Sequence, residues 1–197
     1  MSDALPVVYL VRHGETAWSR TGQHTSFTDL SLTQQGEQEA RRVGQRLANL
    51  QFAKVFTSPL KRAADTCELA GFGARAEIDP DLVEWNYGKY EGRKTVDIHA
   101  EAPDWQLFRD GCPGGENPAQ VGGRADRVLT RVRTVRGDVL IFSSGHFLRV
   151  LAARWLGFEP GGGKFFTLST ASVSVLGFEN NVTQPVLRLW NDTSHGD

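Results

Sequence analysis

Two side chains suited to phosphate chemistry, Arg12 and His13, are adjacent in the sequence and are followed by Gly14. A guanidinium offers a rigid fork of donors that matches phosphate oxygens, and a neutral imidazole can attack phosphorus. Because Gly14 has no Cβ, we expect backbone and ligand to approach closely there. The pair alone is more typical of a capping arginine and a hydrogen-bonded histidine at a strand end, so the phosphate interpretation depends on other stretches.

A second arginine and a second histidine occupy comparable places. Arg62 follows the apolar residues 52–57 and Pro59, so we expect it in the first turn of a helix, beside free backbone N–H groups. His146 follows the apolar residues 138–143 at the start of another helix. If these strand ends converge with that of Arg12-His13, they bring two arginines and two imidazoles to one anion site.

Residues 81–92 and 17–31 are the other stretches that could contribute to such a site. In residues 81–92 acidic side chains lie among aromatics and glycines, and a carboxyl group packed against apolar rings has a raised pKa, as a general acid requires. A surface loop with exposed carboxylates is the alternative. Residues 17–31 read as a loop in which Ser19 and Thr25 either donate to a phosphate ester or serve as ordinary turn hydroxyls.

Strands alternate with helices along most of the chain, which predicts an α/β fold with a mostly parallel sheet covered on both faces. Thr33 is typical of a helix N-cap, and residues 161–163 are predicted to form a flexible glycine loop. The frequent arginines of residues 118–136 are expected on a solvated helix face. The expected strands are 7–11, 52–57, 75–78, 138–143, 172–178 and 186–190, and the main expected helices are 34–50, 95–102, 118–136 and 145–156.

The composition restricts the class of protein. The length of 197 residues suits one domain, and the net charge of -1 argues against a general attraction to nucleic acid or to a membrane. Cys67 and Cys112 form neither a disulfide framework nor a metal-ligand pair by spacing, and the first six residues lack a secretion signal. These features predict a cytoplasmic protein with reduced thiols. No Asp/Glu cluster suited to magnesium accompanies the arginines, so we expect no metal or other cofactor.

Four stretches, in this order, make the chain resemble the histidine phosphatase superfamily, which includes the cofactor-dependent phosphoglycerate mutases. The resemblance implies a single domain over residues 1–197 with a phosphoglycerate mutase-like fold, a three-layer α/β/α sandwich. The matching stretches are Leu10-Val11-Arg12-His13-Gly14-Glu15-Thr16, Thr57-Ser58-Pro59-Leu60-Lys61-Arg62-Ala63, Leu82-Val83-Glu84 with Tyr87-Gly88 and Glu91-Gly92, and Ser144-Gly145-His146 with Leu148-Arg149.

The resemblance also implies a mechanism. His13 attacks the phosphoryl group and becomes phosphohistidine, while Glu84 protonates the leaving oxygen and later activates water. The oxygens of the transferring group are held by three cationic or hydrogen-bonding side chains, those of Arg12, Arg62 and His146. The resemblance further implies that Ser19, Thr25 and Phe147 belong to the substrate-binding site.

Two departures from the mutases favour a phosphatase. The long insertion that the mutases carry after the segment matching Glu91-Gly92 is absent, and Ser19 replaces their usual asparagine. Residues 18–19 and 84–92 most resemble the branch of fungal sugar-bisphosphate phosphatases, which implies a small sugar phosphate as substrate. A phosphoglycerate mutase and a non-catalytic phospho-ligand binding protein remain alternatives, and the oligomeric state, including a homo-oligomer, stays open. A metal hydrolase is disfavoured because the arginines would repel the cation.

Overall fold

A computed structural model describes residues 5–196, and its centre is a six-stranded sheet in the order β3-β2-β4-β1-β5-β6. The first four strands in this order run parallel, whereas β5 and β6 run antiparallel to their neighbours. The predicted mostly parallel sheet is therefore confirmed. The strands are β1 (Val8–Arg12), β2 (Lys54–Thr57), β3 (Ala76–Ile78), β4 (Val139–Ser143), β5 (Val173–Phe178) and β6 (Pro185–Asp192).

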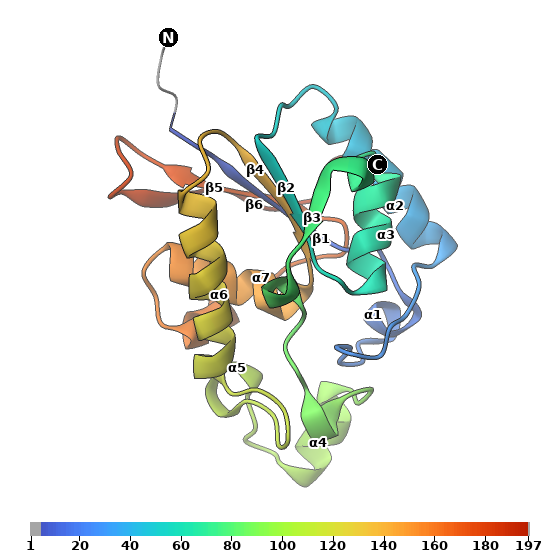
Figure 1. The fold of residues 1–197 in the computed structure, drawn as a ribbon. Helices are drawn as coiled ribbons and strands as arrows, with labels where there is room; N and C mark the ends of the chain where they lie inside the picture. The colour runs from blue at the N-terminus through green and yellow to red at the C-terminus, as the bar shows by residue number, and fades with distance from the viewer. Residues whose placement is uncertain (1–4, 197) are drawn as a thin grey trace.

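Helices cover both faces of the sheet, with α2 and α3 on one side and α6 and α7 on the other (Figure 1). The α-helices are α1 (Ala17–Thr21), α2 (Gln34–Leu47), α3 (Lys61–Leu69), α4 (Thr95–Glu101), α5 (Leu107–Asp110), α6 (Pro118–Arg133) and α7 (Gly145–Trp155). Short 3₁₀ turns occur at Gly73–Arg75, Pro80–Leu82, Gly88–Tyr90 and Pro160–Phe165. None of these helices is long and apolar enough to cross a membrane. The prediction that the first six residues lack a secretion signal falls largely on residues 1–4, which lie outside the described residues.

Two apolar cores result from the alternation of side chains along the buried strands. In β1, Val8 and Leu10 pack into the core beneath α6 and α7, whereas Val11 packs into the core beneath α2 and α3. In β4 the residues Val139 and Ile141 face the first core, and Leu140 and Phe142 face the second. Burial on both faces explains why β1 and β4 read as continuous apolar runs.

Several boundaries differ from the prediction for local reasons. Residues 17–31 do not form a loop throughout, because the hydroxyls of Thr16 and Ser19 form a capping box that starts α1. The predicted N-cap Thr33 is confirmed, although α2 ends at Leu47 and not at residue 50. Pro59 lies before the first turn of α3 and not within it.

The glycines at 161–163 also differ from their prediction, since they belong to a 3₁₀ turn and not to a flexible loop. Gly163 lies against the ring of Phe108, where a Cβ would be only 2.5 Å from a ring carbon. The packing of this turn against α5 therefore depends on the absence of a side chain at that position.

The pairing of β1 with β4 brings the two histidine segments together. These strands are parallel neighbours, and Arg12 is opposite Ser143 in the register. The chain therefore leaves both strands at the same edge of the sheet, with His13 after β1 and the N-terminus of α7 after β4. β1 is connected to β2 across β4, so this is the kind of crossover point at which open α/β sheets bind ligands.

Candidate active site

A cavity of about 230 Å³ lies at this edge of the sheet. Its wall contains most of the side chains that the sequence predicts for the site, although they come from distant parts of the chain. Residues of β1, the 16–25 segment, the 84–87 segment and α7 meet there. The predicted residues that line it are Arg12, His13, Ser19, Thr25, Glu84 and His146.

His13 is held as a neutral imidazole. Its Nδ1 lies 2.8 Å from the carbonyl oxygen of Gly14, and because a carbonyl can only accept, Nδ1 carries the proton and donates. The ring is 5% exposed, and desolvation by burial, followed by the charges of Arg62 and Arg12, holds the pKa of His13 well below its ordinary 6.5. The other ring nitrogen, Nε2, consequently keeps an unprotonated lone pair.

His146 is neutral as well, but its tautomer is the opposite one. Its Nδ1 lies 2.6 Å from the hydroxyl oxygen of Tyr87, and the hydroxyl has no other partner among residues 5–196 that would accept its proton. Tyr87 therefore donates to Nδ1, which leaves the proton of the imidazole on Nε2. Burial, reinforced by the charge of Arg149, keeps the pKa of His146 well below 6.5, and burial raises the pKa of Tyr87 well above 10.

Arg12 is half-buried, with its guanidinium against the start of α7. One of its terminal nitrogens donates to the carbonyl of Leu168, while its Nε is buried without a hydrogen-bond partner in the described part of the chain. A Cβ on Gly145 would lie 3.2 Å from this Nε, so the guanidinium needs the glycine to lie against the helix. Burial also lowers the pKa of Arg12.

Gly14 has a different role from the one expected. A Cβ there would lie 2.3 Å from the carbonyl oxygen of Gly36 in α2. The glycine therefore permits the close approach of two backbones, and not the approach of a ligand as the sequence suggested.

Glu84 is oriented by backbone donors. Its Oε1 accepts hydrogen bonds of 2.8 Å from the N–H groups of Trp85 and Phe147, and its Oε2 accepts one of 3.0 Å from the N–H of His146. Two of these donors belong to the first turn of α7, where free N–H groups favour a carboxylate. Oε2 receives the fewer hydrogen bonds and is the oxygen with room for a proton. Glu84 is 5% exposed, and the groups shown to orient its carboxylate are these backbone N–H donors.

Arg62 and Phe147 are not among the residues that line the cavity, and their predicted contact with substrate stays a prediction. Arg62 is 0% exposed, and its terminal nitrogens donate to the carbonyls of Ser26 at 3.1 Å and Thr25 at 3.0 Å. Its charge still lowers the pKa of His13. The ring of Phe147 is buried as well, and this residue contributes its backbone N–H to Glu84.

The two predicted hydroxyls line the cavity but have other partners. The hydroxyl of Ser19 donates to the carbonyl of Thr16 at 3.1 Å and accepts from the backbone N–H of the same residue at 2.8 Å, within the capping box of α1. The hydroxyl of Thr25 donates to the carbonyl of Gln23 at 3.1 Å. Both would have to exchange these bonds in order to donate to a ligand.

Sequence reasoning missed several side chains that line the cavity, chiefly Tyr87, His24 and Arg149. Burial lowers the pKa of His24 to about 4. Arg149 donates from Nε to the carbonyl of Gly163 at 3.1 Å and lies over the ring of Phe108 at 4.4 Å. The position of Arg149 one turn after His146, on the same side of α7, was the available signal.

No group of three or more His, Cys, Asp or Glu side chains that could hold a metal ion occurs within residues 5–196. The cations that face the cavity are the guanidinium groups of Arg12 and Arg149, and Glu84 is the one carboxylate in its described wall. This excess of positive charge suits an anion.

Comparisons with known proteins agree with this chemistry. The model of the histidine phosphatase superfamily (branch 1) matches residues 8–193. An acid phosphatase of Mycobacterium tuberculosis is 42% identical over 179 residues, which span 89% of this chain and 88% of that protein. The sedoheptulose 1,7-bisphosphatase of Saccharomyces cerevisiae is 36% identical over 190 residues, which span 80% of this chain and 70% of that protein.

A solved structure of a Mycobacterium tuberculosis open reading frame has the same fold. It superimposes with a TM-score of 0.91 at 38% sequence identity, and the match covers 98% of this chain and 99% of that chain. Further relatives, at 30% to 34% identity, bear the name phosphoglycerate mutase.

Proposed function

This chain belongs to the histidine phosphatase superfamily, and on that basis we propose that it hydrolyses small phosphate monoesters, sugar phosphates among them, through a phosphohistidine on His13. The relatives at 42% and 36% identity are named as phosphatases, and the superfamily works through such an intermediate. The observation that carries the assignment to His13 is the hydrogen bond from its Nδ1 to the Gly14 carbonyl, which leaves Nε2 free to attack phosphorus.

The reaction then proceeds in two displacements. Nε2 of His13 forms a bond to phosphorus as the P–O bond to the leaving group breaks, and Glu84 gives its proton to the departing oxygen. Water next attacks the phosphohistidine and returns a proton to Glu84, so that inorganic phosphate and the original enzyme result. The N–H at Nε2 of His146 and the guanidinium of Arg12 stabilise the oxygens of the transferring group.

Arg62 acts in this proposal through its charge and through the loop that it holds. Its bonds to the carbonyls of residues 25 and 26 fix the wall of the cavity opposite α7, and its buried Nε has no partner among the described residues. An unpaired buried donor is costly, so a phosphoryl oxygen would be a favourable acceptor for it.

A sugar phosphate is proposed because polar groups surround the part of the cavity beyond the histidines. Arg149, His24, Gln23 and Thr95 line it and would hydrogen-bond the hydroxyls or a second anionic group of a sugar phosphate. The sedoheptulose 1,7-bisphosphatase of yeast bears the name of such a substrate.

We further propose a single domain over residues 1–197 that works in the cytoplasm on small molecules, without a nucleic-acid or membrane partner. Support comes from the two buried, unbridged cysteines Cys67 and Cys112 and from the net charge of -1. Association into a homo-oligomer remains compatible with this function.

Phosphate release from a panel of esters, measured with excess chelator for the wild type and for His13→Ala, tests the proposal. The panel would contain 3-phosphoglycerate, sugar monophosphates and bisphosphates, and an aryl phosphate. Release by the wild type alone is expected, with a sugar phosphate as the best substrate. Isomerisation of 3-phosphoglycerate without release would indicate a mutase, and binding of esters with neither reaction would indicate a binding protein. Either result would overturn the proposal.

A further inference from the structure

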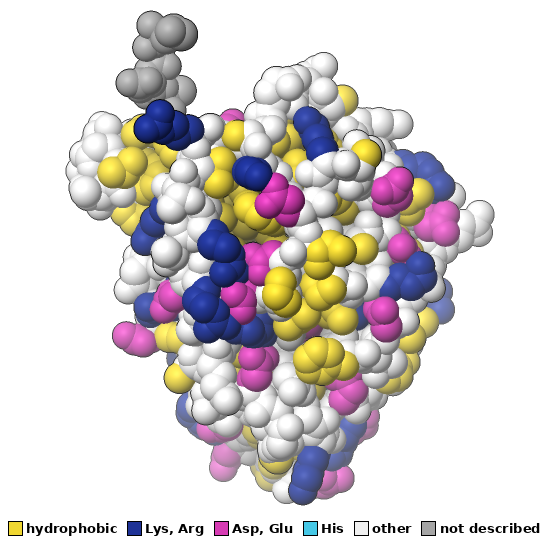
Figure 2. Space-filling model, in the orientation of Figure 1, with side chains coloured by type: hydrophobic (Ala, Val, Ile, Leu, Met, Phe, Trp, Pro, Cys, Tyr) yellow, Lys and Arg dark blue, Asp and Glu magenta, His cyan; other side chains and the backbone are white. Residues whose placement is uncertain are grey.

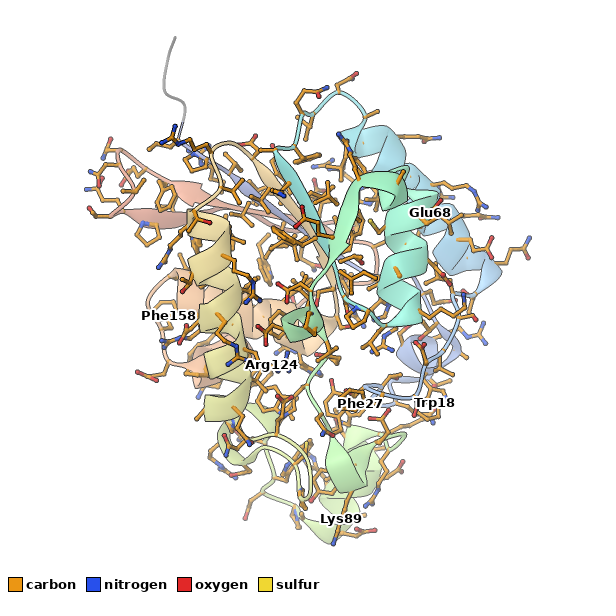
Figure 3. All side chains as sticks on the ribbon, in the orientation of Figure 1. Trp18, Phe27, Glu68, Lys89, Arg124 and Phe158 are labelled. Carbon is orange, nitrogen blue, oxygen red and sulfur yellow. The ribbon has the colours of Figure 1, made fainter. Side chains whose placement is uncertain are left out.

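Arg124 of α6 is a buried arginine outside the cavity whose five N–H groups all have partners. The sequence predicted a solvated helix face here, yet only 11% of this side chain is exposed. In Figure 3 it lies on the side of α6 that faces the middle of the molecule. Its Nε and one terminal nitrogen bind the two carboxylate oxygens of Glu116 at 2.7 and 2.8 Å. A guanidinium has five N–H donors, and the other three reach main-chain carbonyls.

Those three carbonyls belong to the segment that ends in Glu84. Arg124 donates to the carbonyl oxygen of Asp81 at 2.7 Å, of Val83 at 3.0 Å and of Glu84 itself at 3.3 Å. After the 3₁₀ turn Pro80–Leu82 this segment has no regular structure and few backbone hydrogen bonds of its own, so external donors fix its path. Arg124 thus supplies three main-chain contacts that hold the segment leading to Glu84 against α6.

Glu116 extends the same clamp to the residues after Glu84. Its carboxylate accepts from the backbone N–H of Asn86 at 2.8 Å, and its carbonyl accepts from the indole N–H of Trp85 at 2.9 Å. The Arg124–Glu116 pair therefore holds the chain on both sides of Glu84.

Arg124 also contacts α7, which carries the donors for the Glu84 carboxylate. Its guanidinium carbon lies 4.9 Å from the centre of the Phe147 ring, in a cation–π geometry. Phe147 is the residue whose backbone N–H binds Oε1 of Glu84. The guanidinium thus contacts both the 81–84 segment and α7. The distance between these two elements determines where the Glu84 carboxylate points.

We infer that Arg124, paired with Glu116, is a positioning residue that aims the Glu84 carboxylate at the leaving oxygen of the substrate. This inference rests on the proposed role of Glu84 as proton donor. Arg124 itself does not line the cavity, so it acts through the main chain of residues 81–84. Small displacements of an acid from a reacting atom are enough to lower a rate by about 10²-fold.

Arg127, on the same helix, provides a matched control. It binds the carboxylate of Asp81, at the outer end of the segment, and 57% of its side chain is exposed. Figure 2 shows basic side chains over α6 with acidic ones among them, the surface to which this pair belongs. Exposed ion pairs contribute little, so Arg127→Gln should leave catalysis unchanged.

The test is the dependence of kcat/KM on the leaving group, measured with alkyl phosphates, phenyl phosphate and dinitrophenyl phosphate. A proton donor matters for a basic leaving oxygen and hardly at all for dinitrophenolate. For Arg124→Lys, which keeps the charge but loses the planar fork, we expect a loss of about 10²-fold with alkyl phosphates and less than about 5-fold with dinitrophenyl phosphate. Glu116→Gln should show the same pattern with a smaller loss, and it supplies the result if Arg124→Lys does not fold.

Glu84→Gln and the double variant Glu84→Gln/Arg124→Lys separate this inference from the proposed function. Once Glu84 cannot donate a proton, Arg124→Lys should cause less than about 3-fold additional loss, since the two changes remove one effect. Equal losses with every leaving group, or losses that multiply in the double variant, would show that Arg124 only supports the fold. A wild-type leaving-group dependence in Glu84→Gln would instead overturn the role of Glu84 in the proposed function.

Discussion

The two strand ends that meet at the cavity each carry a neutral, buried histidine, yet they offer a ligand opposite groups. After β1, His13 donates from Nδ1 to the carbonyl of Gly14 and presents a lone pair at Nε2. After β4, His146 accepts at Nδ1 from the hydroxyl of Tyr87 and presents an N–H at Nε2. One end is built as a nucleophile, and the other is built as a hydrogen-bond donor.

The difference arises from the partner of each Nδ1 and not from the imidazole. A carbonyl oxygen can only accept, whereas the buried hydroxyl of Tyr87, whose pKa is raised by desolvation, keeps its proton and donates it. Chemical roles in this site are therefore assigned by neighbours that do not react.

Removal of either histidine gives the largest contrast between the two ends. His13→Ala should lower kcat by at least about 10³-fold and abolish phosphorylation of the enzyme, because no nucleophile remains. His146→Ala should lower kcat by about 10²-fold to 10³-fold, as expected for loss of one transition-state donor, and should still form phosphoenzyme. Steady-state rates together with phosphoenzyme yield make the comparison. Equal loss of phosphoenzyme in both variants would contradict it.

Tyr87→Phe tests the partner of His146 alone. Without the hydroxyl, neither tautomer of His146 is favoured by this neighbour, so we expect kcat to fall by about 10-fold while phosphoenzyme still forms. Tyr90→Phe is the control, since Tyr90 packs on Trp105 outside the cavity. NMR of the imidazole nitrogens would report the tautomer directly, and an unchanged His146 signal in Tyr87→Phe would refute the assignment.

The sequence predicted the framework of this site but not the neighbours that define its chemistry. β1 and β4 are buried on both faces, so their apolar runs were readable, and Arg12, His13 and His146 follow from the strand ends. The environments of Arg62 and Arg124 were not readable. The main-chain carbonyls that they bind lie about 40 residues away along the chain, and helical spacing alone does not show which arginine of α6 is buried.

The short helix α1 was missed for a different reason. Its five residues begin at a capping box of Thr16 and Ser19, and hydroxyls of this kind are equally common in turns. Tyr87 was likewise overlooked as a partner of His146, because only the folded chain brings the two residues together.

The pH dependence of kcat/KM should distinguish His13 from His146, because the charge of Arg62 affects the pKa of His13. The charge of Arg62 follows burial as a cause of the lowered pKa of His13 and is not among the causes given for His146. Neutral His13 persists below pH 6.5, so the acid limb of kcat/KM should lie below 6.5. In Arg62→Gln the pKa of His13 rises, and the limb should move to higher pH with the same substrate. A limb that stays in place would show that His13 does not set it.

The smallest expected effect is on how the free energy of unfolding depends on pH. It involves His24, which lies beside Tyr87 in the wall of the cavity. The pKa of His24 falls from 6.5 to about 4 on folding, so the unfolded chain binds more protons between these values. The free energy of unfolding should therefore decrease as pH falls through this window, by at most about 1.4 kcal/mol per pH unit for this group. His24→Phe should flatten the slope in denaturant titrations between pH 6.5 and 4. An unchanged slope would indicate that His24 is charged in the folded protein.

The contrast between the two histidines is tested most directly by locating the phosphoryl group on the enzyme. The phosphoenzyme would be trapped by rapid acid-free quenching after mixing with the best ester, then examined by peptide mass spectrometry and phosphorus NMR. Phosphate on Nε2 of His13 is the predicted result, because Nδ1 of that ring is committed to the Gly14 carbonyl. Phosphate on His146, or on Nδ1 of His13, would contradict the assignment of nucleophile and donor.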